Sequence, residues 1–332
     1  MDWTKGFSAA YYVSIVDPTT WKDTERLEIT SGSISFTNEG LRSASDFECT
    51  EYDSDRELWV RIWLDARQEG ESGHVPLFTG LASAPDRDIN GRSESMKIQC
   101  CSVLQPAQDV LLMRGWYAPK NIRASIIIED LLKVTPAPIE IEGTTPRLYE
   151  PIVAEEGENH LTMTDKILTA IGWRMSIKGD GSILIRPMPA DAVAIFDPMV
   201  NDVIETKLSE SYDWQTAPNV IRASTEARSV IIKDESDSIL SVPSRGREIW
   251  IEESDVNLND GESLEGYAER RLKEEQNINR TVSYTRIYNP DILVTDLVDL
   301  RYPAQNIDGQ FRIESQNITL GYGASVSEEV SL

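Results

Sequence analysis

The sequence predicts a β-rich α+β fold. Both ends of the 332-residue chain carry short runs in which β-branched and aromatic residues alternate with polar ones. Only the middle has apolar residues at helical spacing. At roughly 150 residues per domain, this length allows two or three domains. We therefore expect a β domain over residues 1–104, an α+β domain over 105–190 and a second β domain over 191–332.

The first domain is predicted to consist of short strands. After "AAYYVSIV" comes a turn signal. In "RLEITSGSISFT" Gly32 is expected to break the alternating run of Leu27 and Ile29, which Ile34 and Phe36 continue beyond it. "ELWVRIWLDA" alternates, with Trp59 and Trp63 on the face opposite its aliphatic residues. A face with two tryptophans is either covered or part of an interface. Two more strands flank an Asn90-Gly91 turn, and this spacing suggests a barrel or a sandwich.

The middle domain is predicted to hold two helices and a hairpin. "NIRASIIIEDLLKVT" places four apolar residues on one helix face: Ile127, Ile128, Leu131 and Leu132. In "LTMTDKILTAIG" we expect Thr162 as the N-cap, Asp165 to complete a capping box and Gly172 to end the helix. "WRMSIKGDGSILIRP" then alternates on both sides of a turn at residues 179–181, which predicts a hairpin.

The last domain is predicted to be β, with a surface helix near residues 263–276. The residues on one face of that helix are Leu264, Tyr267, Ala268 and Leu272. Near the end of the chain the apolar positions change parity. They are odd at Phe311 and Ile313, but even from Ile318 onward. A straight strand cannot bury both sets, so we expect a bulge or kink between Glu314 and Asn317.

The charge excludes some classes of partner. Thirty-two Lys and Arg against 56 Asp and Glu give a formal net charge of −24. Such a chain is repelled by phosphate backbones and anionic membranes, so we expect no specific nucleic-acid binding. No apolar run approaches the roughly 20 residues of a membrane helix, and no secretory signal is recognisable at the start, so no membrane insertion is expected. Solubility is the ordinary reason for such a charge.

The residues that usually carry chemistry are sparse. Cys49, Cys100 and Cys101 form no metal-binding or disulfide pattern, and we interpret them as small hydrophobic residues in strands. His74 and His160 each lie in a polar stretch without a second histidine at ligand spacing. We interpret both as residues of the surface or of a helix start.

One segment comes close to a calcium loop. In "DVNLNDGESLEG", Asp255, Asn257 and Asn259 occupy the first, third and fifth places. However, Asp260 stands where glycine is needed and Gly266 where glutamate is needed, so an Asx-rich turn is expected instead. Phosphate-binding, dinucleotide, serine-hydrolase and zinc-protease motifs are missing from the sequence, and its many acids single out no catalytic pair. We expect no catalytic residue, no cofactor and no metal, and so no enzyme.

The order of three segments resembles the first half of a phage tail baseplate hub protein: "VPLFTG", "MKIQCCSVLQPAQDVLLMRGW" and "SIIIEDLL". This family includes the late control protein D type and the hubs of prophage tails. "NHLTMTDKILTAIGWRMSIKGDGSILIRP" is similar to the family's helix and hairpin, and "GYAERRLKEEQ" to its later helix. "YNPDILVTDLVDLRYP" and "GQFRIESQNITLGYGASVSEEVSL" are similar to its ending. Where the family commonly has Gly-Asp in a turn, this chain has Thr295-Asp296, and the Asp296 carboxylate can cap that turn.

The resemblance implies an assembly role. Such hubs hold two related β-barrels in one chain, here about 1–104 and 191–332, with the α+β region between them. Three copies form a homotrimer, a ring of six barrels that joins the tail tube to a spike or tip. The expected partners are further copies of the chain, the tail tube or distal tail proteins, the spike or tip protein and, as a further candidate, the tape measure protein. The protein would be made in the bacterial host cytoplasm and end in the virion, with part of its acidic charge lining the DNA ejection channel.

Two alternatives belong to other classes. A tail-associated cell-wall hydrolase would need an added catalytic module. A receptor-binding or carbohydrate-binding tail module would use aromatic side chains, and the candidates are Trp59, Trp63, Trp116 and Tyr117.

Overall fold

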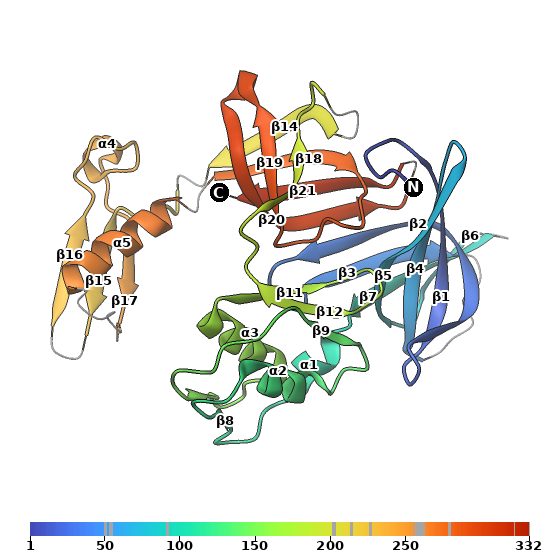
Figure 1. Cartoon of the computed structure of the whole chain (residues 1–332), viewed down its shortest axis with the longest axis horizontal. Helices are drawn as coiled ribbons and strands as arrows, with labels where there is room; N and C mark the ends of the chain where they lie inside the picture. Colours follow the sequence, from blue (N-terminus) through green and yellow to red (C-terminus); the bar gives the residue numbers. More distant parts are fainter. Residues whose placement is uncertain are drawn as a thin grey trace. The chain divides into compact units, whose positions relative to one another are not determined.

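The computed structural model describes most of the chain (Figure 1): residues 1–49, 52, 56–90, 93–200, 204–212, 215–225, 228–254, 256, 263–277, 280–321 and 323–331. It forms two compact units. Unit 1 is Met1–Lys207 with Tyr284–Glu329, and unit 2 is Leu208–Ser283 with Val330–Leu332. In the described part of the chain, no helix is both long and apolar enough to cross a membrane.

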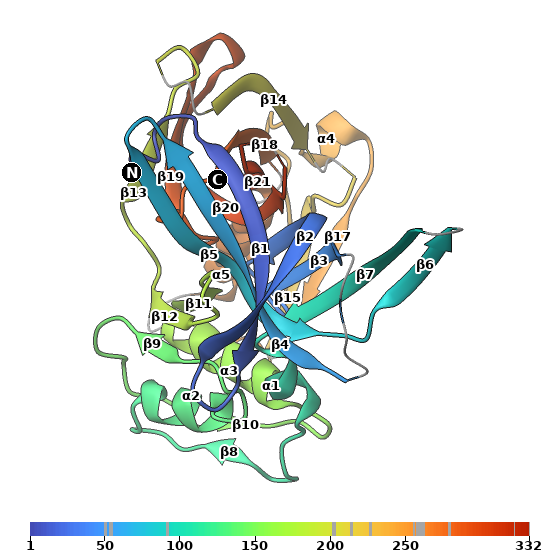
Figure 2. The ribbon, with the colours of Figure 1, turned by 90° about the vertical axis from the view of Figure 1, so that its right-hand side faces the viewer.

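The first β domain is a closed barrel (Figure 2). Its strands are β1 (Ser8–Asp17), β2 (Lys22–Thr37), β3 (Ser43–Cys49), β4 (Leu58–Gln68), β5 (Glu71–Ala82) and β7 (Ser93–Ser102). They follow the order β1-β4-β5-β7-β3-β2, and the pairing of β1 with β2 closes the ring. A short strand, β6 (Asp86–Asn90), pairs with β7. The aliphatic face of β4 fills the interior, where Val60, Ile62 and Leu64 are fully buried. Of the two predicted architectures, a barrel or a sandwich, the domain forms the barrel.

The alternating run changes near Gly32, as expected, but the strand does not end there. β2 runs through Gly32, and its pairing with β3 shifts register between Ile29 and Ser31 instead. A Cβ atom at Gly32 would lie 2.5 Å from the Asp46 carbonyl oxygen. Glycine at this position therefore permits close approach of β3 and does not end the strand. Gly91, in the expected Asn90-Gly91 turn, lies outside the described residues.

The middle region has the predicted helices and hairpin. Its elements are α1 (Gln105–Asp109), β8 (Tyr117–Ala118), α2 (Ala124–Leu132), β9 (Ile139–Ile141), β10 (Ile152–Val153), α3 (His160–Ile171), β11 (Trp173–Ile177) and β12 (Ile183–Pro187). The four apolar residues predicted for α2 are all buried. β11 pairs antiparallel with β12, and β9 lies parallel to β12.

The start of α3 differs from the prediction. Asn159 is the N-cap, and its Oδ1 accepts a hydrogen bond from the Thr162 backbone N–H at 2.8 Å. Thr162 therefore lies inside the helix, and the capping-box prediction was wrong. Asparagine is among the best N-cap residues, because its side-chain oxygen can accept a hydrogen bond from the N–H of the third helical residue. Here that third residue is Thr162 itself. Gly172 ends the helix with φ of 68°, as predicted.

The second barrel repeats the strand order of the first. Its strands are β13 (Ala192–Phe196), β14 (Ile204–Tyr212), β18 (Arg280–Ile287), β19 (Leu297–Tyr302), β20 (Ile307–Thr319) and β21 (Ser325–Ser331), with a short 3-10 turn η1 (Pro303–Gln305). Taken in chain order, the path β13-β19-β20-β21-β18-β14 matches β1-β4-β5-β7-β3-β2 strand for strand. One difference is that β13 runs parallel to β19, whereas β1 runs antiparallel to β4. Two related β-barrels with an α+β region between them are confirmed as the fold class.

One strand pairing joins the two barrels. β2 pairs antiparallel with β20, from Ser33 opposite Thr319 to Thr37 opposite Ser315, so both barrels share one continuous sheet. The change of parity in β20, from which a bulge or kink between Glu314 and Asn317 was predicted, lies at this place, and the bulge itself stays a prediction. Before this point the buried residues are the odd-numbered Phe311 and Ile313, and after it they are the even-numbered Gln316 and Ile318. The strand β20 continues through this change to Thr319. The change coincides with a change of neighbour from β19 to β2.

Unit 2 contains a small α/β structure, inserted in the chain between β14 and β18. Its elements are β15 (Val220–Ser224), β16 (Ser229–Lys233), α4 (Val242–Arg245), β17 (Trp250–Glu253) and α5 (Leu264–Asn277). The sheet order is β16-β15-β17, and α5 buries Leu264, Ala268 and Leu272 against it. The predicted surface helix near 263–276 is thus α5. The predicted domain boundaries after residues 104 and 190 both fall inside unit 1 and stay a prediction; the third predicted domain, 191–332, includes residues of both units.

Candidate functional site

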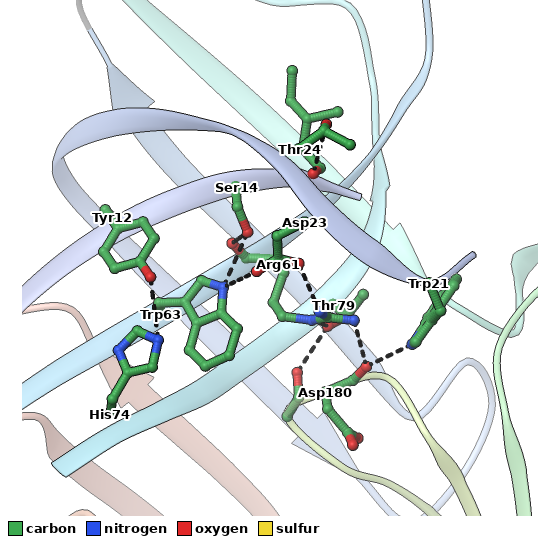
Figure 3. A network of polar contacts seen from close by, with 12 residues as sticks. Tyr12, Ser14, Trp21, Asp23, Thr24, Arg61, Trp63, His74, Thr79 and Asp180 are labelled. Carbon is green, nitrogen blue, oxygen red and sulfur yellow. Dashed lines mark hydrogen bonds and ion pairs between the residues drawn. The ribbon is translucent and has the colours of Figure 1, made fainter. Parts of the chain in front are cut away.

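The hairpin β11–β12 contacts both barrels, and we call residues 173–187 the brace. Its turn lies on the outer face of the first barrel (Figure 3). The Asp180 carbonyl accepts hydrogen bonds from Arg61 Nη2 at 3.1 Å and from Trp21 Nε1 at 3.0 Å. Thr79 Oγ1 donates to the Gly179 carbonyl at 2.9 Å. Three barrel side chains therefore satisfy the turn carbonyls.

The buried Arg61 is fully engaged in this contact. Its Nε donates to Thr79 Oγ1 at 3.0 Å, and its Nη1 pairs with Asp23 Oδ1 at 2.6 Å (Figure 3). Asp23 also accepts a hydrogen bond from Trp63 Nε1 at 2.8 Å. A buried guanidinium is stable only when its donors are paired, so Arg61 requires both the carboxylate and the turn.

The turn approaches the barrel so closely that side chains are excluded at two positions. A Cβ atom at Gly179 would lie 2.0 Å from the Pro76 carbonyl oxygen. At Gly181 φ is +83°, and a Cβ atom would lie 2.8 Å from the Trp21 ring. Both glycines of "GDG" are therefore required by the contact as well as by the turn.

The strands of the brace contact the segment just before β19 in the second barrel. Arg186 Nη2 lies 2.6 Å from Asp296 Oδ1, and Ser176 Oγ donates to the Val294 carbonyl at 2.9 Å. Asp296 Oδ2 accepts a hydrogen bond from the Leu293 N–H at 2.7 Å, so this carboxylate caps the turn as predicted. Burial raises the pKa of Asp296, while the Leu293 hydrogen bond and the Arg186 charge act in the opposite direction.

Thr295 occupies the turn position at which the hub family commonly has glycine. Its φ is +79°, in the left-handed region that favours glycine, and it is buried. Its N–H donates to the Ile313 carbonyl at 2.9 Å, and its Oγ1 lies 3.2 Å from Ser176 Oγ. The turn therefore keeps a geometry suited to glycine although the residue is threonine.

A further ion pair ties the brace and α3 to the turn between β2 and β3. The buried Arg42 has φ of 60°, and its Nε donates to the Met175 carbonyl at 3.1 Å. Its Nη2 pairs with Asp165 Oδ1 at 2.6 Å. Burial raises the pKa of Asp165, and the Arg42 charge opposes this shift. Asp165, which was expected in a capping box, thus holds a connection between the first barrel and the middle region.

The exposed side of the shared sheet carries mainly small polar side chains. Its rows cross four strands, β7, β3, β2 and β20, as in the row Gln99, Asp46, Ser33 and Thr319. We call this surface the polar face, and it consists of Lys97, Gln99, Cys101, Ala44, Asp46, Glu48, Ser31, Ser33, Ser35, Thr37, Ser315, Asn317 and Thr319. The alternate residues are buried apolar side chains such as Ile34 and Phe47. It bears hydroxyls, two acids and one lysine.

A hollow of about 180 Å³ lies where the brace, β5 and the segment before β19 meet. Its lining is mainly apolar and includes Pro76, Leu77, Ile177, Tyr288 and Ile292. It offers a place for an apolar group, with Lys178 and Asp180 also on its lining.

The remaining predicted residues are spread over the fold. Cys49 and Cys100 are buried and Cys101 is exposed, and burial raises the pKa of the Cys100 thiol. His74 is exposed with its Nδ1 2.6 Å from Asp65 Oδ1, and His160 is the first residue of α3. In the described part of the chain no group of three possible metal ligands occurs. The calcium-like positions 255, 257, 259 and 260 lie outside the described residues.

The four aromatic residues considered for carbohydrate binding lie on two different elements. Trp59 and Trp63 belong to β4, where Trp59 packs against Trp21 with ring centroids 5.7 Å apart. Trp116 and Tyr117 lie at the start of β8 in the middle region. They do not form one platform. Sequence reasoning missed Arg42, Arg61 and Arg186 as the residues that fix the brace. For Arg61 and Arg186 the signal available was an arginine within an otherwise apolar strand, whereas Arg42 lies after a polar turn and gave no such signal.

Comparison with known proteins relates this arrangement to tail proteins. No family model and no curated protein matches the sequence. Among solved structures, the 43 kDa tail protein of prophage MuSo2 from Shewanella oneidensis has a TM-score of 0.70 at 12% identity, covering 97% of this chain and 96% of the other. The tail protein from Neisseria meningitidis also has a TM-score of 0.70, at 14% identity and 97% coverage of both chains. This chain has the tail-protein fold.

A third tail-protein structure agrees with the first two. Prophage tail protein gp18 from Listeria monocytogenes has a TM-score of 0.55 at 16% identity, with 97% of this chain and 94% of the other covered. The coverage extends over both barrels and the region between them. The resemblance inferred from the residues is therefore confirmed at the level of the tail-protein fold.

Proposed function

We propose that this chain is a structural component of a phage or phage-like tail tip, and that three copies form a ring of six barrels that joins the tail tube to a spike or tip. The observation that carries this proposal is the pair of barrels with one strand order, joined edge to edge through β2 and β20. A chain with two such barrels can occupy two neighbouring positions of a sixfold ring. Three copies then match a sixfold tube on one side and a threefold spike on the other.

The brace supplies the rigidity that a ring needs. A ring closes only if the two barrels of each chain keep a fixed angle. The brace touches the first barrel through Arg61 and the second through Arg186, on opposite parts of one hairpin. The Arg61 guanidinium and the Asp296 carboxylate are both buried and paired in these contacts, which makes the hairpin a rigid spacer.

The polar face is suited to the wall of a channel. It spans both barrels without interruption, and its hydroxyl-bearing side chains offer neither an apolar patch nor a dense charge to a passing polymer. The sequence led us to expect an acidic lumen, and we propose a channel wall that is only weakly acidic. On this surface the negative charges of Asp46 and Glu48 are partly offset by the positive charge of Lys97.

The partners follow from this role. Besides further copies of itself, we propose the tail tube or distal tail proteins, the spike or tip protein and the tape measure protein, all within the virion. The support for a role without catalysis is that the buried charged groups packed around the brace, Arg61, Asp296 and Arg42, are engaged in structural contacts. Cell-wall hydrolysis and glycan binding are the competing functions.

The deciding experiment is the mass of the purified protein by light scattering over a range of concentrations, alone and co-expressed with the adjacent tube protein. A mass of three times 37.3 kDa, with six lobes in electron micrographs, is the expected result. A chain that stays monomeric in both preparations contradicts the ring. Release of labelled peptidoglycan would then favour the hydrolase, and binding on a glycan array would favour the carbohydrate-binding module.

A further inference from the structure

The strand order identifies the side of each barrel that lies away from the β2–β20 joint. In the closed first barrel, β5 is three strands from β2 in either direction, and β4 is two strands away. In the second barrel, β14 is three strands from β20 and β13 is two strands away. In a ring, each barrel contacts one neighbour at the joint and another on its far side. The far sides around β4–β5 and β13–β14 are therefore where successive copies would meet.

An exposed apolar strip lies on the far side of the second barrel. On β13, Val193 is 48% and Ile195 is 50% exposed, while Phe196 at the end of the strand is buried. Directly after the strand, Met199 is 83% and Val200 is 77% exposed. These four residues are the apolar strip. Among the barrel-strand residues whose burial is described, no other large apolar side chains are this exposed.

An aromatic ladder runs from β1 onto the far side of the first barrel, where two of its three rings lie on β4 and β5. It consists of Tyr12 on β1, Trp63 on β4 and His74 on β5 (Figure 3). The Trp63 and His74 rings stack with centroids 4.2 Å apart and planes 5° apart, and Tyr12 lies nearly parallel to His74 at 6.0 Å. Arg26 Cζ lies 3.7 Å above the Tyr12 ring. His74 is exposed, and Tyr12 and Trp63 are half-buried. Rigid aromatic side chains of this kind, held by their neighbours, are favoured at protein interfaces.

We propose that the apolar strip of one copy docks on the aromatic ladder of the next copy, and that this contact closes the ring. The inference rests on the proposed ring and adds the surfaces that build it. The two surfaces differ in composition and lie on different barrels of one chain, as a head-to-tail contact requires. A twofold contact would instead place the strip against another strip and would leave the ladder uncovered.

The first test is a double substitution in the strip, Val193→Asp with Ile195→Asp. Burying two carboxylates in an apolar contact should weaken association by more than about 100-fold and leave monomers at concentrations where the wild-type protein is trimeric. The control is Leu111→Asp with Met113→Asp, two apolar residues of the middle region that are more exposed, at 62% and 85%, and it should remain trimeric. Circular dichroism and the unfolding temperature show whether each variant is folded.

The second test uses paired cysteines in a Cys101→Ser background. Val193→Cys and His74→Cys variants, mixed or combined in one chain, should be joined by a short bismaleimide, whereas neither variant should cross-link with itself. Cross-linking of Val193→Cys alone would reveal a twofold contact and overturn the inference. A trimer that persists in the double aspartate variant also overturns it while leaving the ring intact. A wild-type chain that stays monomeric, alone and with its tube partner, overturns the ring and the inference together.

Discussion

Arg186 and Asp296 form an ion pair of 2.6 Å between the brace and the second barrel, and the Asp296 side chain is only 1% exposed. The two residues are 110 positions apart in the chain, so the pair forms only when both parts are folded and in place. The same carboxylate also caps the turn that precedes β19. One side chain thus controls both a local turn and a long-range contact.

Removing the arginine should therefore be costly. Arg186→Met leaves the Asp296 carboxylate buried with only its backbone partner, and we expect the free energy of unfolding to fall by about 3 kcal/mol. Asp130→Asn, which removes an exposed pair with Lys133, should change it by less than about 1 kcal/mol. Denaturant unfolding measures both. A loss for Arg186→Met no larger than that of the control would show that the pair does not hold the brace.

Thr295 should carry backbone strain that glycine would relieve. At φ of +79° the Cβ atom and its branches are unfavourable by about 1 to 2 kcal/mol. Thr295→Gly and Thr295→Ala both lose the Oγ1 contact with Ser176, but only the glycine removes the strain. The glycine variant should consequently have the higher free energy of unfolding by about 1 kcal/mol, less than the full strain because glycine has more entropy to lose. Equal stability of the two variants would contradict this account of the turn.

The elements of unit 1 could largely be predicted because their signals are local. Alternation in β4 and helical spacing in α2 each identify a buried face without knowledge of the rest of the fold. The parity change in β20 predicted a switch near residue 315, but its cause, an exchange of neighbouring strands, is a property of two barrels together. Gly32 shows the limit most clearly, because its role is set by the approach of Asp46 on another strand.

The contacts of the brace could not be predicted because they depend on distant partners. Arg42, Arg61 and Arg186 resemble exposed strand or turn arginines until the elements that bury them are known. Asp165 had a plausible local role as a capping-box residue, and a tertiary ion pair replaced it. The resemblance to hub proteins indicated that the two barrels are related, whereas the surfaces that we propose for the ring could be inferred only from the strand order.

Adding one methyl group to the turn of the brace should loosen it. In Gly179→Ala the new Cβ atom would meet the Pro76 carbonyl oxygen, so either the turn or β5 must move. We expect an unfolding free energy lower by about 2 kcal/mol. Gly6→Ala, where a Cβ atom meets nothing within 4 Å, is the matched control and should change it little. If both variants unfold at the same temperature, the turn does not pack on the barrel as described.

Alkaline pH should destabilise the chain through its buried tyrosines. Burial raises the pKa of Tyr11 and of Tyr302 to about 12, from about 10 in an unfolded chain. Because the folded state holds these protons more tightly, their contribution to stability is complete below pH 10 and is lost as the pH rises to about 12. Tyrosinate absorbance should lag behind that of the urea-unfolded protein in this range. Titration of all tyrosines at about pH 10 while the fold persists would refute the burial of these two hydroxyls.

Cys101 offers a direct probe of the polar face. It is exposed on β7, whereas Cys49 and Cys100 are buried, so a small maleimide should label the folded chain once and the denatured chain three times. Cys101→Ser should abolish labelling of the folded protein. In an assembled tail tip with the polar face turned to the channel, a small maleimide should still react, but one carried on a large polymer should react far more slowly than with the isolated chain. Equal rates of the polymer reagent in both states would place this face on the outside of the ring.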